Sequence, residues 1–145
     1  MTLPIDITFE STELGAREGI ARVISALTER GLSQDHLGTV EIALAESVNN
    51  IIEHAFAGLA PDVVRVRLLL ERNLLVLTIH DNGNALPNEE MPPGDPADLQ
   101  VARSELPEGG FGWFLIRELT TTLSYVRKDG SNILTLQFDL GSDSN

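Results

Sequence analysis

Residues 62–81 read DVVRVRLLLERNLLVLTIHD, in which two apolar runs flank the polar pair Arg72–Asn73. Each run has the length and the apolar pattern of a β-strand. The two residues between the runs leave room only for a tight turn, and so short a connection joins antiparallel neighbours. This stretch therefore predicts a β-hairpin.

The residues before the hairpin predict one strand and two helices. Residues 3–10 alternate between apolar and polar side chains, as a strand does. A first helical pattern follows and ends at Gly31, and a second begins at the N-cap Ser33 and ends near residues 56–58. The first helix carries an apolar stripe that is expected to face the core, formed by Leu14, Ile20, Val23, Ile24 and Leu27.

After the hairpin, the pattern predicts a loop (residues 82–109), a helix (112–122) and two strands (123–128 and 133–140). The complete order predicts an α+β fold. It is a two-layer α/β sandwich, with a mixed, mostly antiparallel sheet and helices on one face. A chain of 145 residues has the usual size of one domain. Residues 1–140 are therefore expected to form a single domain, and residues 141–145 a polar tail.

The composition excludes several classes of protein. Asp and Glu outnumber Lys and Arg by 22 to 10, for a formal net charge of -12, so no direct binding to nucleic acid or anionic membranes is expected. The absence of cysteine excludes disulfides, thiolate metal sites and cysteine catalysis. No apolar run approaches the roughly 20 residues of a membrane span, and the N-terminus lacks a signal-peptide pattern. A cytoplasmic protein is expected.

The loop at residues 82–109 carries five of the seven prolines and breaks every periodicity. Connections this long are typically lids, binding loops or disordered segments. Within the loop, DPAD at residues 95–98 combines a capping residue with an N1 proline. This combination predicts one short helix.

The second predicted helix contains EIALAESVNNIIEHAF at residues 41–56, which places Glu46 and Asn50 four residues apart on one face. A carboxylate and a carboxamide at this spacing can coordinate a hard cation, or orient a nucleophile while the amide holds the metal. The same pair also occurs on solvated helix faces, so the spacing alone leaves both interpretations open.

Two glycine-containing stretches add further candidates. Asp81 ends a strand and begins DNGNALP, which is either a turn or a carboxylate that accepts a hydrogen bond from a ligand amine while Gly83 lets the ligand approach the backbone. Gly109, Gly110 and Gly112 come directly before an apolar helix. They indicate either an anion site at the helix N-terminus or a tightly packed helix entry.

These signals occur in one order: ExxxN at residues 46–50, DxGxxxP at 81–87, a lid, and GGFG at 109–112. That order resembles the N box, first glycine box, ATP lid and second glycine box of the GHKL (Bergerat-fold) ATPase and kinase superfamily. The segments ESVNNIIEHAF and GGFGWFLIREL are similar to those of the RsbW-type anti-sigma factors, which are serine-protein kinases of bacterial partner-switching systems. The resemblance covers essentially the whole chain, to about residue 140.

The resemblance implies a role for each matching residue. Glu46 would be the general base. Asn50 would bind the Mg²⁺ that bridges the phosphates of ATP. Asp81 would bind the adenine amino group, and Gly83 would lie close to the base.

The second glycine box and the residues around it match the family pattern less well than the other boxes. Gly110 and Gly112 would give the phosphates backbone room. Related kinases often carry an arginine beside this box, whereas this chain reads ELPEGG. Arg103 in the lid is a candidate substitute, and a solvated loop arginine is the alternative. Thr135 is near a hydroxyl that the superfamily often uses beside adenine, and a cross-strand pair explains it equally well.

The resemblance implies an ATP-dependent serine/threonine kinase in a partner-switching module. It would phosphorylate a STAS-domain anti-sigma antagonist, sequester a sigma factor and form a homodimer. One alternative is a nucleotide-binding module that sequesters its partner without phosphotransfer. Another is a stand-alone histidine-kinase-like ATP domain, which Glu46 disfavours because such domains typically carry asparagine at that position.

Overall fold

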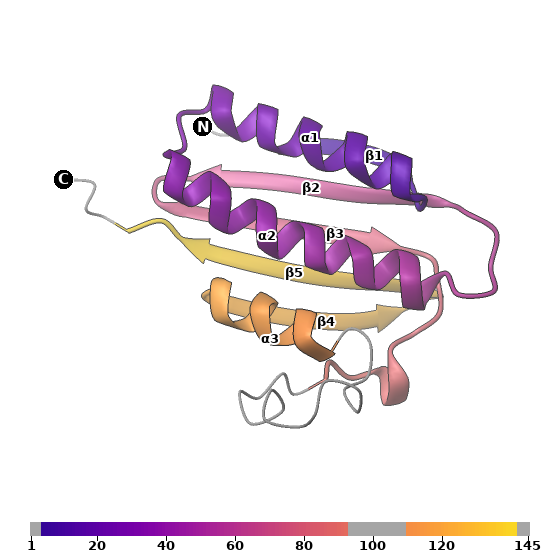
Figure 1. Cartoon of the computed structure of the whole chain (residues 1–145). Coiled ribbons are helices and arrows are strands. Elements are labelled where there is room, and N and C mark those ends of the chain that lie inside the picture. Colours follow the sequence, from indigo (N-terminus) through magenta and orange to yellow (C-terminus); the bar gives the residue numbers. More distant parts are fainter. Residues whose placement is uncertain (1–3, 93–109, 142–145) are drawn as a thin grey trace.

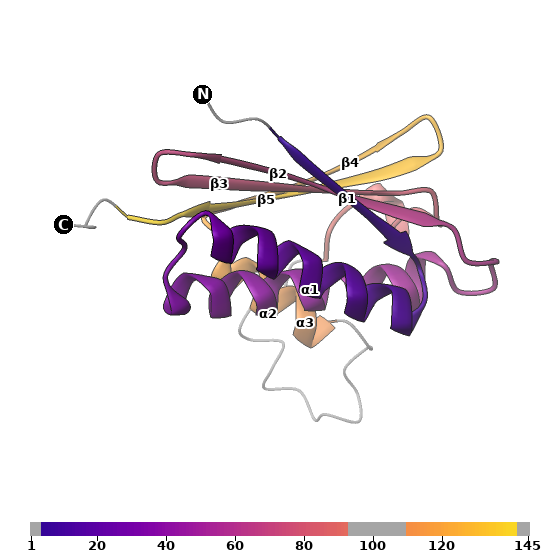
Figure 2. The same ribbon diagram turned by 90° about the horizontal axis from the view of Figure 1, so that it is seen from above.

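The computed structural model describes residues 4–92 and 110–141. In this part of the chain, five strands form one sheet and three α-helices lie together on one of its faces (Figure 1). The view from above separates the two layers (Figure 2). The predicted two-layer sandwich is confirmed. The short helix predicted at residues 95–98 and residues 142–145 of the predicted tail lie outside the described residues.

The strands are β1 (Ile5–Glu10), β2 (Val63–Glu71), β3 (Leu74–Asp81), β4 (Thr122–Lys128) and β5 (Ser131–Asp139). Their order in the sheet is β1-β2-β3-β5-β4, and each pairing among these described strands is antiparallel. The sheet is thus more uniform than the mixed, mostly antiparallel sheet that the sequence predicts. The hairpin of residues 62–81 supplies β2 and β3, and the pairing of β3 with β5 attaches the C-terminal hairpin.

The helices are α1 (Glu13–Glu29), α2 (Gln34–Asn50) and α3 (Gly110–Leu119). The side chain of Thr12 accepts a hydrogen bond from the Gly15 N–H (3.0 Å), and that of Ser33 accepts one from the His36 N–H (3.2 Å). These N-caps satisfy N–H groups that have no partner within the helix. Among the described residues, none of the helices is both long and apolar enough to cross a membrane.

The core lies between the sheet and the helices. Every second residue of β2 and β3 faces the helices, because side chains alternate along a strand. Each such buried side chain contributes about 1.5–3 kcal/mol to stability. The inward residues of these two strands are 0–2% exposed: Val64, Val66, Leu68, Leu75, Leu77 and Ile79.

Leu14 does not belong to this core, which corrects the predicted apolar stripe of α1. Its side chain is 61% exposed. The buried face of α1 is formed by Ala16, Gly19, Val23 and Leu27. Leu14 lies two residues before Ala16, about 200° around the helix, and therefore points away from the sheet.

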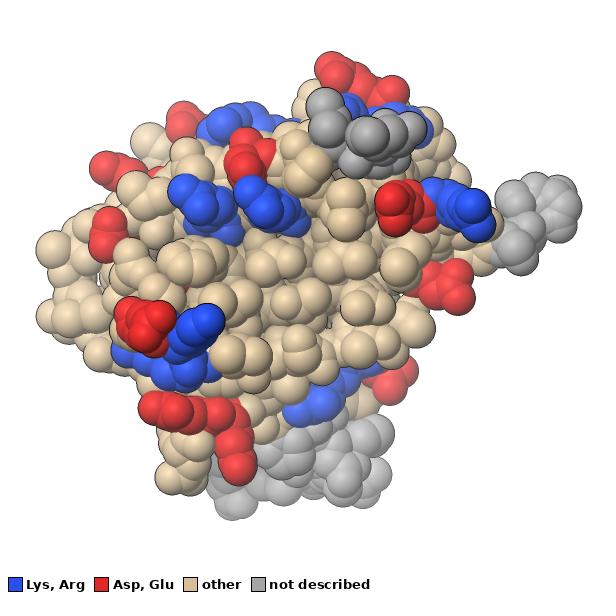
Figure 3. Space-filling model, turned by 180° about the vertical axis from the view of Figure 1, so that it is seen from behind, with Lys and Arg blue, Asp and Glu red and all other residues tan. Residues whose placement is uncertain are grey.

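The helices leave the other face of the sheet open. Seen from that side, charged groups lie toward the margins and the middle of the face is uncharged (Figure 3). Arg67 pairs with Asp6 across β2 and β1 (3.1 Å), with both side chains about half exposed. An ion pair this exposed contributes little to stability.

Two helical glycines are expected to respond to alanine in opposite directions. A Cβ at Gly15 would collide with the backbone carbonyl oxygen of Glu10, whereas a Cβ at Gly38 would meet nothing within 4 Å. Gly15→Ala is therefore expected to lower the free energy of unfolding by about 1–3 kcal/mol. Gly38→Ala is expected to raise it by about 0.5–1 kcal/mol. Urea unfolding of both variants measures the two effects, and a stabilised Gly15→Ala would contradict the packing of α1 on β1.

Candidate functional site

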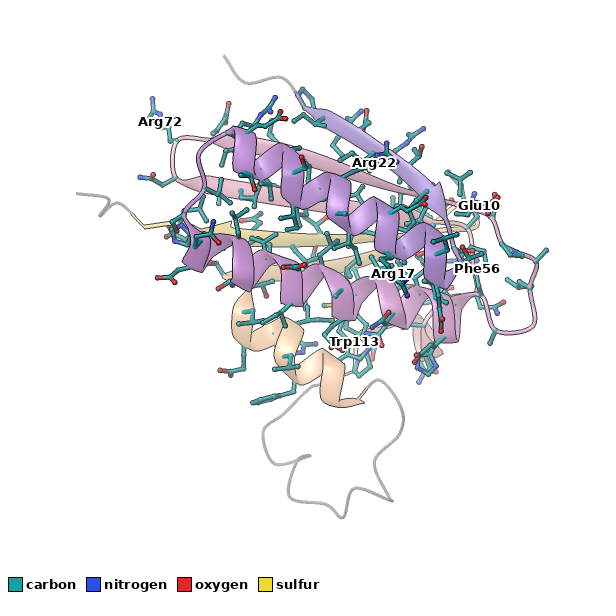
Figure 4. The ribbon with its side chains drawn as sticks, turned by 45° about the horizontal axis from the view of Figure 1, so that its top comes forward. Glu10, Arg17, Arg22, Phe56, Arg72 and Trp113 are labelled. Atoms are coloured by element: carbon teal, nitrogen blue, oxygen red, sulfur yellow. The ribbon has the colours of Figure 1, made fainter. Side chains whose placement is uncertain are left out.

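A cavity of about 450 Å³ opens where the end of α2, the ends of the central strands and the start of α3 meet. This volume lies within the range of small-ligand sites. Trp113, which is 5% exposed, lies near the N-terminal end of α3 beside α2 (Figure 4). The larger apolar side chains of the wall are Ile51, Leu86, Trp113 and Leu134. Walls of this kind suit a flat organic ligand held by a few polar groups.

Asp81 is the buried acid of the cavity. It ends β3 and is 2% exposed. Its Oδ1 accepts hydrogen bonds from the Gly83 N–H (2.8 Å) and from Asn132 Nδ2 (2.9 Å). Burial raises the pKa of Asp81, while these two hydrogen bonds and the nearby charges of His80 and Arg127 act in the opposite direction. Within the described residues, Oδ2 accepts no hydrogen bond.

Asn132 holds Asp81 from the neighbouring strand. The register of β3 and β5 places the two residues directly opposite each other. Nδ2 of Asn132 also donates to the Asn84 carbonyl (2.9 Å), and its Oδ1 accepts from Tyr125 Oη (2.5 Å) and from Arg127 Nη1 (3.0 Å). Side chains from three adjacent strands thus converge on one buried amide.

The sequence motifs do not predict Asn132, Tyr125 or Arg127 as site residues. One signal for Asn132 is present in the sequence. It occupies an inward position of β5, in line with the buried Leu134 and Leu136, and a polar residue at such a position indicates a built hydrogen-bond site. Tyr125 and Arg127 become recognisable only once β4 is placed beside β5.

Asn50 ends α2 and lines the cavity. Its Nδ2 is buried and has no hydrogen-bond partner among the described residues. A π-helical turn (Ile51–Ala55) follows, closed by a hydrogen bond from the Phe56 N–H to the Ile51 carbonyl (2.9 Å). A buried polar group without a partner is costly unless a ligand satisfies it, and π turns inside helices are frequent at functional sites.

Glu46 lies one helical turn before Asn50, beside the start of α3. A Cβ on Gly112 would lie 2.6 Å from Glu46 Oε1. The glycine therefore makes room for this carboxylate, and its predicted place beside the phosphates stays a prediction. Gly110 is the first residue of α3. Gly109 lies outside the described residues.

Gly83 has a packing role, and its predicted contact with the base stays a prediction. A Cβ at this position would lie 2.6 Å from the carbonyl oxygen of Ala55. The same carbonyl accepts a hydrogen bond from the Asn84 N–H (2.7 Å). The glycine thus lets the loop after β3 approach the π turn that follows α2, which joins the two halves of the site.

The structure does not bring Thr135 to the cavity. Leu134 faces the cavity, and Thr135 points to the open face of the sheet, because successive side chains of a strand alternate. There it is opposite Thr78 of β3 and Ser124 of β4. Thr135 is thus part of a cross-strand row of hydroxyl side chains and is not among the residues that line the cavity. Arg103 lies outside the described residues.

The family follows from the match of the chain to known proteins. Residues 10–138 match the family described as the histidine kinase-like ATPase domain. This chain belongs to that family. The resemblance indicated by the sequence motifs is confirmed, and an ATPase domain of this kind implies ATP as the ligand.

Two curated relatives of this chain carry the names of protein kinases. Serine/threonine-protein kinase BtrW of Bordetella bronchiseptica is 36% identical over 99 residues, which cover 68% of this chain and 67% of that protein. Serine-protein kinase RsbW of Bacillus cereus is 28% identical over 109 residues, covering 74% and 68%. The predicted relationship to serine-protein kinases is thus confirmed.

Two solved structures share the fold. A crystal structure of the RsbU and RsbW domains of a Mycobacterium tuberculosis protein matches 94% of this chain with a TM-score of 0.64 and 21% identity. This chain spans about a third (32%) of that larger chain. The SiaB–SiaC complex of Pseudomonas aeruginosa matches 94% of this chain and 88% of the other, with a TM-score of 0.59 and 15% identity.

Asp81→Asn is expected to preserve or raise the free energy of unfolding near neutral pH. The amide oxygen can still accept from Gly83 and Asn132, and the cost of a buried charge is removed. Because the pKa of Asp81 is raised in the folded protein, this cost is fully present above the raised pKa and is lost as the pH falls from there to the ordinary pKa of an unfolded aspartate. The advantage of the variant should therefore be largest near neutrality and shrink in acid.

Urea unfolding at neutral and mildly acidic pH tests this expectation, and Asp6→Asn is the matched control. A hydrogen bond from Arg67 lowers the pKa of Asp6 in the folded protein. Loss of this carboxylate is therefore expected to lower stability at neutral pH and to have a smaller effect in acid, the opposite sign to Asp81→Asn. A strongly destabilised Asp81→Asn would contradict the assignment of Asp81 as a costly buried acid.

Proposed function

We propose that this chain is an ATP-dependent serine/threonine-protein kinase and an anti-sigma factor of a partner-switching module. One arrangement carries the proposal. The buried carboxylate of Asp81 and the unpartnered amide of Asn50 share one cavity, and Glu46 lies one helical turn from Asn50. The kinase names of the curated relatives support the reaction class.

The inner part of the cavity fits an adenine ring. Ile51, Leu134 and Trp113 supply apolar surface for a flat base. At the bottom of this space, Asp81 Oδ2 is available as an acceptor, and the amino group of adenine is a matching donor. We assign Asp81 as the residue that binds this amino group.

The residues at the end of α2 fit a magnesium ion. Mg²⁺ takes oxygen ligands, keeps several waters and uses few protein groups. Asn50 would supply its side-chain oxygen to the ion, and its buried Nδ2, which has no partner among the described residues, would be left to donate to a phosphate oxygen. No cluster of three acidic or histidine side chains occurs among the described residues. We assign Asn50 as the protein ligand. Bound Mg-ATP would supply the γ-phosphoryl group and the charge neutralisation that phosphoryl transfer requires.

Glu46 is proposed as the general base. Its carboxylate lies beside Gly112 of α3 and one turn from the proposed metal ligand. A serine or threonine hydroxyl of a protein substrate placed there can give its proton to Glu46 as it attacks. Gly110, Gly112 and the N-terminal turn of α3 are proposed to face the phosphates, with Arg103 as a candidate contact.

The proposed partners rest on the family resemblance, and the kinase names of the relatives support a protein substrate. The protein substrate is proposed to be a STAS-domain anti-sigma antagonist, and the sequestered partner a sigma factor. A homodimer and a cytoplasmic location are part of the same proposal. The net charge of -12 agrees with protein partners and opposes nucleic-acid binding.

A second candidate function is nucleotide-dependent sequestration of the partner without phosphotransfer. The sequence ELPEGG at residues 105–110 carries no arginine where related kinases often have one. If no other cationic side chain reaches the γ-phosphate, the chain would still bind nucleotide but would not transfer the phosphoryl group. The test of Glu46 below separates the two candidates.

Glu46→Gln is expected to lower the rate of phosphotransfer by at least about a hundredfold, because the amide cannot accept the hydroxyl proton. Nucleotide affinity should remain essentially unchanged, because Asp81 and Asn50 are intact. Mixing the protein with Mg-ATP and purified STAS-domain proteins of the source organism, followed by phosphosite mapping, measures transfer. Calorimetry measures binding.

Glu41→Gln, an exposed position on the same helix, is the matched control and should transfer phosphate at the wild-type rate. Undiminished transfer by Glu46→Gln would remove the proposed role of Glu46. Nucleotide binding by the wild type without transfer to any of the STAS-domain proteins would favour sequestration alone.

A further inference from the structure

Every hydrogen-bond donor and acceptor position of the Asn132 side-chain amide has a partner. An asparagine amide offers two N–H donors and one oxygen with two lone pairs. Here Nδ2 donates to Asp81 Oδ1 and to the Asn84 carbonyl, both at 2.9 Å. Oδ1 accepts from Tyr125 Oη and from Arg127 Nη1. Turning the amide over would oppose donor to donor and acceptor to acceptor, so the N–H side is fixed toward Asp81.

This fixed amide determines which atom of Asp81 is left for a ligand. Oδ1 is occupied by Asn132 and by the Gly83 N–H. Arg127 also donates to the Gly83 carbonyl (2.7 Å), which ties the same loop to β4. Oδ2 alone is left, and as an atom of a carboxylate it can accept a hydrogen bond and cannot donate one.

The bases of nucleotides differ in what they present to such an acceptor. Adenine carries an amino group at C6, which donates, whereas hypoxanthine and guanine carry a carbonyl oxygen there. An oxygen facing the carboxylate leaves two acceptors opposed without a proton between them. A buried site built for a donor strongly rejects an analogue that lacks it.

We propose that Asn132 is a positioning residue that makes Asp81 select bases with an exocyclic amino group over bases with a carbonyl at the same position. The inference rests on the proposed function, in which the cavity binds ATP. Tyr125 and Arg127 act behind Asn132 by holding its oxygen. Asn132 itself touches Asp81 and is not assigned a contact with the reacting atoms.

The electrostatics of the site agree with this role. Burial raises the pKa of Asp81, and the hydrogen bond from Asn132 is the largest influence that opposes it. The charged groups that act on Asp81 from the neighbouring positions are His80 on its own strand and Arg127 on β4. Without Asn132, Asp81 holds its proton more readily and can donate to a carbonyl oxygen.

The test compares ATP with inosine triphosphate, whose base carries a carbonyl oxygen at C6 in place of the amino group and a proton on N1, where adenine has none. Calorimetry without Mg²⁺ measures both affinities for the full chain. The wild type is expected to prefer ATP by at least about a hundredfold. In Asn132→Leu the affinity for ATP should fall by about tenfold or more, and the preference should fall below about tenfold.

Two further variants keep the test decisive if Asn132→Leu does not fold. Asn132→Asp keeps the oxygen that accepts from Tyr125 and Arg127, and sets a carboxyl group against Asp81 so that the pair shares a proton. It should lose the preference for ATP as well. Thr135→Val changes a side chain on the opposite face of the same strand, leaves the bond between Asn132 and Asp81 intact and should retain the preference. A ¹³C NMR titration of the unliganded protein should give a higher pKa for Asp81 in Asn132→Leu than in the wild type.

The outcomes separate the inference from the function on which it rests. A wild type that binds ATP and inosine triphosphate equally would overturn the selection. Folded Asn132 variants that keep the wild-type preference would overturn the role of Asn132 and leave the ATP site intact. A wild type that binds neither nucleotide, with or without Mg²⁺, would remove the proposed function together with the inference.

Discussion

The antiparallel pairing of β3 with β5 is the constraint on which the site depends. It places Asp81 directly opposite Asn132, so that a carboxylate that is 2% exposed receives a hydrogen bond from the next strand. A buried carboxylate without such donors would take up a proton or move to a solvent-exposed position. The same pairing brings β4 alongside, and with it Tyr125 and Arg127. The pairing of the strands therefore determines which polar side chains meet in the cavity.

Two glycines bring the halves of the site within reach of each other. Gly83 allows the loop after β3 to meet the carbonyl of Ala55, and Gly112 allows α3 to meet the carboxylate of Glu46. In both places a Cβ would lie closer than real side chains approach. Glycine at these positions therefore serves close packing between elements. The result is that Asn50 and Asp81 line one cavity although they come from two elements far apart in sequence, while Glu46 lies beside α3, one helical turn from Asn50 and outside the residues that line the cavity.

The site costs stability in the absence of a ligand. Burial raises the pKa of Asp81, and the Nδ2 atom of Asn50 is buried without a partner among the described residues. Each is unfavourable by itself, and each is relieved by a ligand that supplies the missing partner. Stability given up at a functional site is common in proteins, and the strongly apolar layer between the sheet and α1 and α2 offsets it here.

The sequence by itself determined the described strands and α-helices and two residues that line the cavity, Asn50 and Asp81, and it led to the proposal of Glu46 one turn from Asn50. These depend on local periodicity and on spacing along one helix or at the end of one strand. Only the tertiary structure decided that Asn132 belongs to the site and Thr135 does not. The two residues differ by three positions on one strand, so they point to opposite faces. Which face meets Asp81 is set by register between residues 51 apart in the chain, and local pattern carries no information about that register.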